Sequence, residues 1–177
     1  MPIDRRTRYT KMIIRDSLYE LLEQKPLSDI TVKELCQTAD INRATFYRYY
    51  DNVDALFEQL EQEIVDVYFQ QKSSCENSTV HVLTVIKENR IFYKELFRAH
   101  MDSKALSRLL EQQKQEAILY HQKNGSYDET IFPYAFQYVV SGSTGMIQKW
   151  VNSGCQETPA EFAEIILKIT GGCATLA

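Results

Sequence analysis

Two helix-start signals lie close together in residues 31–50, and they constrain the fold of the chain more than any other feature. Thr31 and Glu34 have the spacing of a capping box, in which two side chains satisfy backbone N–H groups at a helix start. Asn42 is a natural N-cap for another short helix. Asp40 lies in the turn between them, where Asp tolerates a left-handed backbone. The pattern predicts two short helices and a tight turn, which indicates a helix-turn-helix unit or an ordinary αα-hairpin.

The segment 42–50 combines four aromatic rings with two arginines. At 3.6 residues per turn, Phe46 and Tyr49 or Tyr50 lie on one side, and we expect Phe46 to belong to a small core. The polar side chains spread over the rest of the helix: Arg43, Thr45, Tyr47 and Arg48. This face suits a phosphate-lined groove, although both arginines are also compatible with ordinary solvated surface charges.

The remaining chain has helical periodicity throughout and no region with strand periodicity, so we expect an all-α fold of about nine helices. A first helix over residues 5–24 ends before Pro26. A long helix begins at Asn52, and residues 73–78 read as a loop. Later helices follow, with one stop at residues 123–125 and a last start at Thr158-Pro159.

Charge restricts the functions that the chain can have. The net charge is −4, so any contact with nucleic acid has to be local. Residues 1–15 carry five basic side chains against Asp4 alone, and they form a basic N-terminal arm. We expect a cytoplasmic protein, because no apolar leader follows the first methionine.

No cofactor, metal site or catalytic set is expected. The four cysteines have no metal-type spacing and read as free thiols, with redox sensing as the alternative. An enzyme is the rival class, but His81, His100 and His121 lie on separate predicted segments without a catalytic motif beside them.

Residues 130–148 contain no formal charge and approach the length of a membrane span. Their polar residues argue against a membrane, and a buried helix at a subunit or domain contact fits better. Together with the last helix, this segment predicts a homodimer, unless both helices only close the core of the monomer. The expected interface comprises Val139, Ser143, Met146, Ile147, Trp150, Phe162, Ile165, Ile166 and Ile169.

Residues 30–35, 39–50 and 55–56 together resemble the DNA-binding domain of TetR/AcrR-type transcriptional regulators. The resemblance covers about residues 8–58. Three positions depart from the family pattern: Asp40 replaces a frequent glycine, Tyr49 a frequent histidine, and Val53 a lysine that usually meets a phosphate. The resemblance implies a helix-turn-helix DNA-binding domain at residues 1–52 and a helical ligand-binding and dimerisation domain at residues 53–177.

On this basis the recognition helix enters the major groove of a palindromic operator in double-stranded DNA. Arg43 suits a guanine edge, and Ala44 and the methyl of Thr45 suit a thymine methyl. Arg48 suits either a base or a phosphate. Further phosphate contacts are expected from Tyr47, Thr31 and Asn42, with electrostatic attraction from Arg5, Arg6, Arg8 and Lys11.

The resemblance also implies a pocket for an unidentified small-molecule effector and the use of the last two helices for dimerisation. The expected aromatic lining of the pocket is Phe92, Tyr93, Phe97, Tyr120, Phe132 and Phe136. Residues 130–170 additionally resemble a subgroup that includes regulators of dihydroxyacetone kinase operons, which leaves the sign of regulation open. The leading interpretation is a repressor released by its effector, and the alternative is a helical protein-interaction module that binds DNA weakly or not at all.

Overall fold

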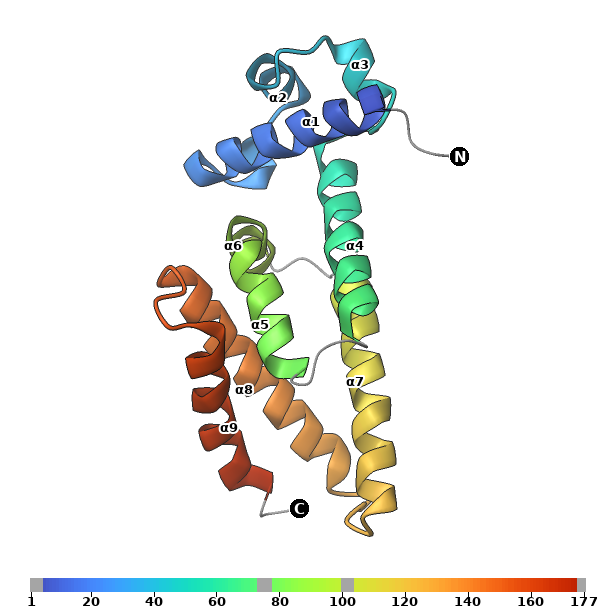
Figure 1. Cartoon of the computed structure of the whole chain (residues 1–177), viewed down its shortest axis with the longest axis vertical. Coiled ribbons are helices and arrows are strands. Elements are labelled where there is room, and N and C mark those ends of the chain that lie inside the picture. Colours follow the sequence, from blue (N-terminus) through green and yellow to red (C-terminus); the bar gives the residue numbers. More distant parts are fainter. Residues whose placement is uncertain (1–4, 73–77, 100–103, 175–177) are drawn as a thin grey trace. The chain divides into compact units, whose positions relative to one another are not determined.

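The computed structural model describes residues 5–72, 78–99 and 104–174, and it confirms the all-α prediction (Figure 1). Within these residues nine α-helices and one short 3₁₀ helix, η1, form, and none of the described residues lies in a strand. The elements are α1 (Arg5–Gln24), η1 (Leu27–Asp29), α2 (Val32–Thr38), α3 (Arg43–Tyr47), α4 (Val53–Lys72), α5 (Ser78–Glu88), α6 (Arg90–Ala99), α7 (Lys104–Lys123), α8 (Phe132–Asn152) and α9 (Pro159–Ala174).

Helix ends follow local signals in the sequence. Helix α1 ends just before Lys25-Pro26, as the sequence predicts. The Oδ1 atom of Asn52 accepts a hydrogen bond from the backbone N–H of Ala55 at 2.7 Å, which caps α4. Gly125 follows α7 with a φ of +68°, a conformation that favours glycine.

The first of two compact units comprises Met1–Ile64 and Ile91–His100, so it contains α1 to α3, the first part of α4, and most of α6. Its core includes the fully buried side chains of Ile14, Leu18, Leu35, Phe46 and Leu56. Helix α6 adds Phe92, whose ring stacks on Phe57 with centroids 4.3 Å apart. The compact units thus divide within α4, whereas the division of function at residue 52 stays a prediction.

The second unit comprises Val65–Arg90 and Met101–Ala177. Helices α5 and α9 pack together there, and both bring buried apolar side chains, such as Leu83 and Phe162. The ring of Trp150 on α8 stacks on Phe162 with centroids 4.6 Å apart. The ammonium group of Lys87 donates to the carbonyl oxygens of Cys155 and Glu157 at 3.0 and 3.2 Å, which ties α5 to the loop before α9.

No helix within the described ranges has both the length and the apolar character that crossing a membrane requires.

Candidate nucleic-acid interface

The turn between α2 and α3 has the geometry that its sequence predicts. Asp40 has a φ of +50°, in the left-handed region. The backbone N–H of Ile41 donates to the carbonyl oxygen of Cys36 at 3.0 Å and closes the turn. Thr31 caps α2, because its hydroxyl oxygen accepts from the backbone N–H of Glu34 at 3.2 Å. The two short helices are therefore fixed relative to each other by backbone geometry and caps.

Thr31 and Glu34 form only half of the expected capping box. The carboxylate of Glu34 lies 2.5 Å from the ammonium group of Lys25 and forms an ion pair with it. The side chain of Glu34 thus joins the start of α2 to the segment after α1. The hydroxyl hydrogen of Thr31, which is exposed, can still donate to an acceptor outside the chain.

Helix α3 separates a buried face from an exposed one. Phe46 is fully buried, and its ring lies 5.6 Å from that of Tyr50, which is also buried. Tyr47 is 54% exposed, and Arg43, Ala44 and Arg48 are exposed as well. Regular helix covers only residues 43–47 of the segment 42–50. One turn of helix therefore presents a guanidinium, a methyl and a phenol to solvent.

Asn42 and Thr45 have structural tasks in addition to their predicted contacts with DNA. The Oδ1 atom of Asn42 accepts from the backbone N–H of Thr45 at 2.7 Å and from its hydroxyl at 2.9 Å. Thr45 is half-buried, and its hydroxyl hydrogen is used in this cap. Both side chains thus help to fix the start of α3.

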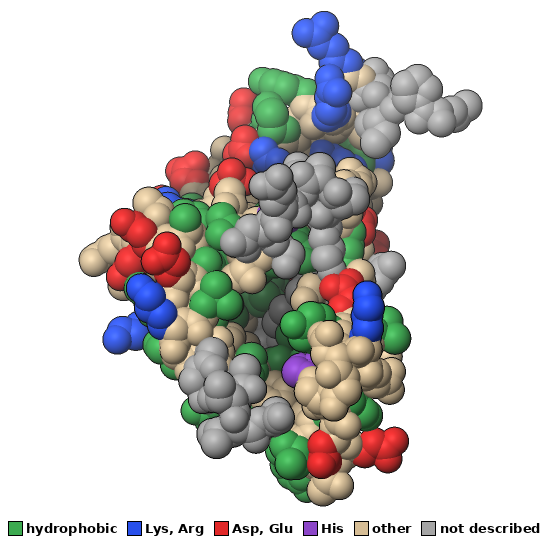
Figure 2. All heavy atoms as spheres, turned by 60° about the horizontal axis from the view of Figure 1, so that its bottom comes forward, with side chains coloured by type: hydrophobic (Ala, Val, Ile, Leu, Met, Phe, Trp, Pro, Cys, Tyr) green, Lys and Arg blue, Asp and Glu red, His purple; other side chains and the backbone are tan. Residues whose placement is uncertain are grey.

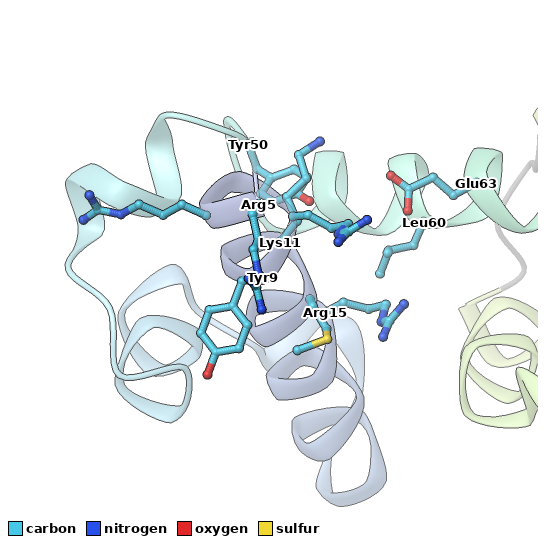
Figure 3. A pocket seen from close by; sticks show the side chains of 10 residues that line it. Arg5, Tyr9, Lys11, Arg15, Tyr50, Leu60 and Glu63 are labelled. Atoms are coloured by element: carbon cyan, nitrogen blue, oxygen red, sulfur yellow. The ribbon is translucent and has the colours of Figure 1, made fainter. Parts of the chain in front are cut away.

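One cation of the basic N-terminal arm, Lys11, lies beside Tyr50 in the segment that follows α3. Arg5, Arg6 and Arg8 are exposed on the first turns of α1. The ammonium group of Lys11 lies 5.7 Å from the ring centroid of Tyr50, within the range of a cation–π interaction. The structure therefore brings the predicted arm cations and the predicted recognition segment into one unit (Figure 3).

Val53 has a structural role. Its side chain is 6% exposed and belongs to the core, in the first turn of α4. An apolar side chain also has no hydrogen-bond donor for a phosphate oxygen. Position 53 therefore cannot make the lysine–phosphate contact that is common in the family that this part of the chain resembles.

The six aromatic residues predicted to line one pocket divide between the two units. Phe92, Tyr93 and Phe97 belong to the first unit, where Phe92 is almost fully buried. Burial, with the nearby charge of Glu61, raises the pKa of Tyr93, which is half-buried among these groups. The second unit contains the others: Tyr120, Phe132 and Phe136. Phe132 and Phe136 stack with centroids 5.9 Å apart, whereas Tyr120 is 66% exposed.

The residues predicted for the dimer interface also divide. Trp150, Phe162 and Ile166 are buried within the single chain, so they form part of the core of the second unit instead of an open face. These residues lie on α8 and α9, but periodicity does not tell which buried surface a stripe enters. Ile165 and Ile169 are 38% and 54% exposed. The others are half-buried: Val139, Ser143, Met146 and Ile147.

The most exposed face of α8 lies outside the predicted dimer interface. Tyr134 and Tyr138 are 78% and 65% exposed, and Ser141, Gly142 and Gly145 continue the same face. A Cβ atom added at either glycine would meet nothing within 4 Å. Figure 2 shows hydrophobic side chains at the surface between charged ones. In the sequence, the absence of charged residues from 130 to 148 is the feature that indicates an exposed apolar face here.

Two of the four cysteines, Cys36 and Cys155, are described with their side chains, and both are buried. Burial raises the pKa of the Cys36 and Cys155 thiols, which disfavours the reactive thiolate. The structure does not describe Cys75, His100 or the side chain of Cys173. Among the residues whose positions are described, no cluster of His, Cys, Asp and Glu could hold a metal ion.

Comparisons with known proteins identify relatives of both parts of the chain. A family model described as "Bacterial regulatory proteins, tetR family" matches residues 14–60, and one described as "Transcriptional regulator C-terminal region" matches residues 73–172. The chain is 31% identical over 96 residues to the HTH-type dhaKLM operon transcriptional activator DhaS of Lactococcus lactis subsp. lactis (strain IL1403). That alignment covers 50% of this chain and 49% of the relative, so it spans about half the length of each.

Two solved structures have the same fold over nearly the whole chain. The dihydroxyacetone kinase operon activator DhaS matches with a TM-score of 0.59 at 20% identity, covering 94% of this chain and 97% of that one. The fatty acid degradation regulator FadR from Bacillus halodurans matches with a TM-score of 0.67 at 12% identity, covering 91% and 94%.

Proposed function

The chain belongs to the TetR family of transcriptional regulators, whose members are not enzymes, and from this premise we propose that it is a homodimeric repressor released from a palindromic DNA operator by a small-molecule effector. The observation that carries the proposal is the exposed face of α3. It presents Arg43, Ala44 and Tyr47 to solvent while Phe46, on the opposite face, holds the helix to its own core.

Each side chain on this face has a role that follows from its chemistry. The guanidinium of Arg43 offers two parallel donors to the O6 and N7 atoms of a guanine, and Ala44 offers a methyl to thymine. The Thr45 methyl supplements Ala44. The phenol of Tyr47 and the hydroxyl of Thr31 donate to phosphate oxygens, and Arg48 does the same or contacts a base.

Asn42 and the arm complete the proposed contact with the DNA backbone. Asn42 contributes its amide N–H groups, since its Oδ1 atom caps α3. The cations of Arg5, Arg6, Arg8 and Lys11 attract the phosphates without reading sequence. Because Val53 offers no cation, we expect the arm to supply a larger share of the electrostatic attraction.

Dimerisation follows from operator geometry. One α3 reads only a few base pairs, so a specific site needs two copies, about 34 Å apart along the DNA. The exposed faces of α8 and α9 support a self-contact, because Tyr138, Ile165 and Ile169 leave apolar surface in water in the single chain. We propose that the effector acts through the second unit and favours a conformation whose recognition helices no longer match two successive major grooves.

Activation is the second candidate for the sign of regulation. It is favoured by the name of the 31% identical relative, which is a transcriptional activator. A reporter gene placed behind the bound promoter separates the two candidates: deletion of the regulator raises expression for a repressor and lowers it for an activator.

The proposal is tested by binding to the DNA that flanks the protein's own gene. Arg43→Ala should lower the preference for the specific sequence by about 1–3 kcal/mol, because the bidentate contact with guanine is lost. Tyr47→Phe should weaken binding to the specific DNA and to unrelated DNA by a similar factor, since a phosphate contact carries no sequence information. Electrophoretic mobility shifts with both kinds of DNA measure these effects.

Arg90→Ala is the matched control, because Arg90 is an exposed arginine of the second unit. It should leave DNA binding unchanged. Affinity of the parent protein should fall steeply as salt rises. Specific binding that survives both substitutions in α3 would overturn the assigned contacts. No specific shift at any salt concentration would favour the helical protein-interaction module instead.

A further inference from the structure

The first unit contains a hollow of about 880 Å³ between α1 and α4, which the proposed contacts with DNA do not explain (Figure 3). Its volume falls within the range of small-molecule sites in proteins, about 300–1,000 Å³. The side chains that line it come from α1, from the end of the recognition segment and from α4: Arg5, Arg6, Arg8, Tyr9, Lys11, Met12, Arg15, Tyr50, Leu60 and Glu63.

The charge of this lining favours an anion. Five of the ten side chains are cationic and only Glu63 is acidic. Arg15 donates two of its five N–H groups to the carboxylate of Asp16, at 3.1 and 3.0 Å, which leaves three for a ligand. Glu63 accepts from the Gln59 amide at 2.9 Å. Guanidinium groups present two parallel N–H donors to a carboxylate, so the arginines of the lining suit a carboxylate ligand. Glu63 disfavours a second negative charge at its end of the hollow, so a monoanion fits best.

The apolar part of the lining distinguishes the ligand from a bare phosphate. Tyr50 and Leu60 are 5% and 4% exposed, and Met12 is 40% exposed. Tyr50 and Leu60 are already shielded from water, so an apolar body would cover mainly Met12 and Tyr9, which is 60% exposed. Burial, together with the charge of Glu63, raises the pKa of Tyr50 to about 12, so its phenol remains neutral at physiological pH.

We propose that the hollow between α1 and α4 is a ligand site for compact organic monoanions with an aromatic or aliphatic body, such as aromatic carboxylates. The carboxylate contacts the cations of α1, and the body covers Tyr9 and Met12. The site shares no lining residue with the effector pocket that the sequence predicts. A consequence rests on the proposed function: the ligand competes with operator phosphates, because Arg5, Arg8 and Lys11 serve both.

Met12 allows a direct test without DNA. The chain has four methionines, of which Met12 lines the hollow and Met146 lies in the second unit on α8. With ¹³C-methyl methionine in the full chain, NMR should show a saturable shift of the Met12 signal on addition of 2-naphthoate. The neutral 2-naphthamide and inorganic phosphate should leave that signal in place. Met12→Leu assigns the signal, and Met146 reports binding elsewhere.

Arg15→Gln weakens the site without removing a residue assigned to DNA. It should lower the affinity for 2-naphthoate about tenfold, as expected for the loss of a charge-assisted contact. Lys33→Gln, which changes an exposed cation on α2, should have no effect. Three results would overturn the proposal: no shift of Met12, an equal shift with phosphate or naphthamide, or equal affinity in Arg15→Gln. None of them depends on whether the protein binds DNA.

Discussion

Glu95 shows how much one side chain can contribute to the stability of the first unit. It is 4% exposed, and its Oε1 atom accepts from the backbone N–H of Leu27 at 2.8 Å. Its other carboxylate oxygen pairs with Arg98. Glu95→Ala should therefore destabilise the first unit by about 3 kcal/mol, because Leu27 keeps a buried, unsatisfied N–H group. Hydrogen exchange of the Leu27 amide measures this loss locally and should become much faster.

Glu58→Ala is the control for that substitution, since Glu58 is an exposed acid of the same unit on α4. It should change the free energy of unfolding by no more than about 0.5 kcal/mol. If the Leu27 amide exchanged at the same rate in Glu95→Ala as in the parent, the Glu95 contact would have no energetic role.

At the scale of residues, sequence predicts what depends on near neighbours. The left-handed Asp40 and the Asn42 cap were predicted, because each requires only residues within one turn. The contact between Glu95 and Leu27 joins residues 68 positions apart. No spacing rule covers such a pair. From the sequence alone, the buried Glu95 therefore looks the same as an acid exposed to solvent.

At the scale of elements, the start of α9 has a complete capping box. The hydroxyl oxygen of Thr158 accepts from the backbone N–H of Glu161 at 3.3 Å, and the Glu161 carboxylate accepts from the backbone N–H of Thr158 at 2.8 Å. The hydrogen bond from the Thr158 backbone holds the pKa of Glu161 below its ordinary value of 4.5. A carboxyl with a lowered pKa stabilises the fold above its ordinary pKa, and the effect disappears as pH falls through the folded-state value.

Glu161→Gln should therefore destabilise the packing of α9 at neutral pH, and the difference from the parent should shrink as pH falls below the ordinary carboxyl value of 4.5. Trp150, the single tryptophan, stacks on Phe162 of α9, so its fluorescence during urea unfolding follows this packing. Glu164→Gln is the matched control on the same helix, since its pair with Lys168, at 3.6 Å, is highly exposed. A pH-independent difference for Glu161→Gln would contradict a role for the carboxylate charge.

Helix positions were more predictable than helix faces. The ends of α1, α7 and α9 carry their own stop or start residues, so local rules suffice. Periodicity also identifies the apolar residues on one face of α8, but it does not show which surface they contact. Trp150 is buried by Phe162 of the same chain, whereas Tyr134 and Tyr138 are exposed. Which stripe enters the core depends on how α5 and α9 pack, and this is long-range information.

At the scale of the whole molecule, the exposed face of α8 provides the sharpest test of the proposed homodimer. Tyr138 is 65% exposed in the single chain, one helical turn before the small residues Ser141 and Gly142. Small residues let a second helix approach closely, and a charge placed there would be buried without a partner. Tyr138→Glu should therefore weaken dimerisation about 100-fold or more, as measured by sedimentation equilibrium.

Leu119→Glu supplies the control, because Leu119 on α7 is also 65% exposed and its replacement adds the same charge to the second unit. It should leave the dimer intact. Tyr138→Glu should also lose specific DNA binding at concentrations where the parent protein binds, since one recognition helix alone contacts only half of the site. If Leu119→Glu dissociated the dimer and Tyr138→Glu did not, the subunits would meet through α7. If neither dissociated it, both faces would be free for another partner, and the interface would have to lie outside them.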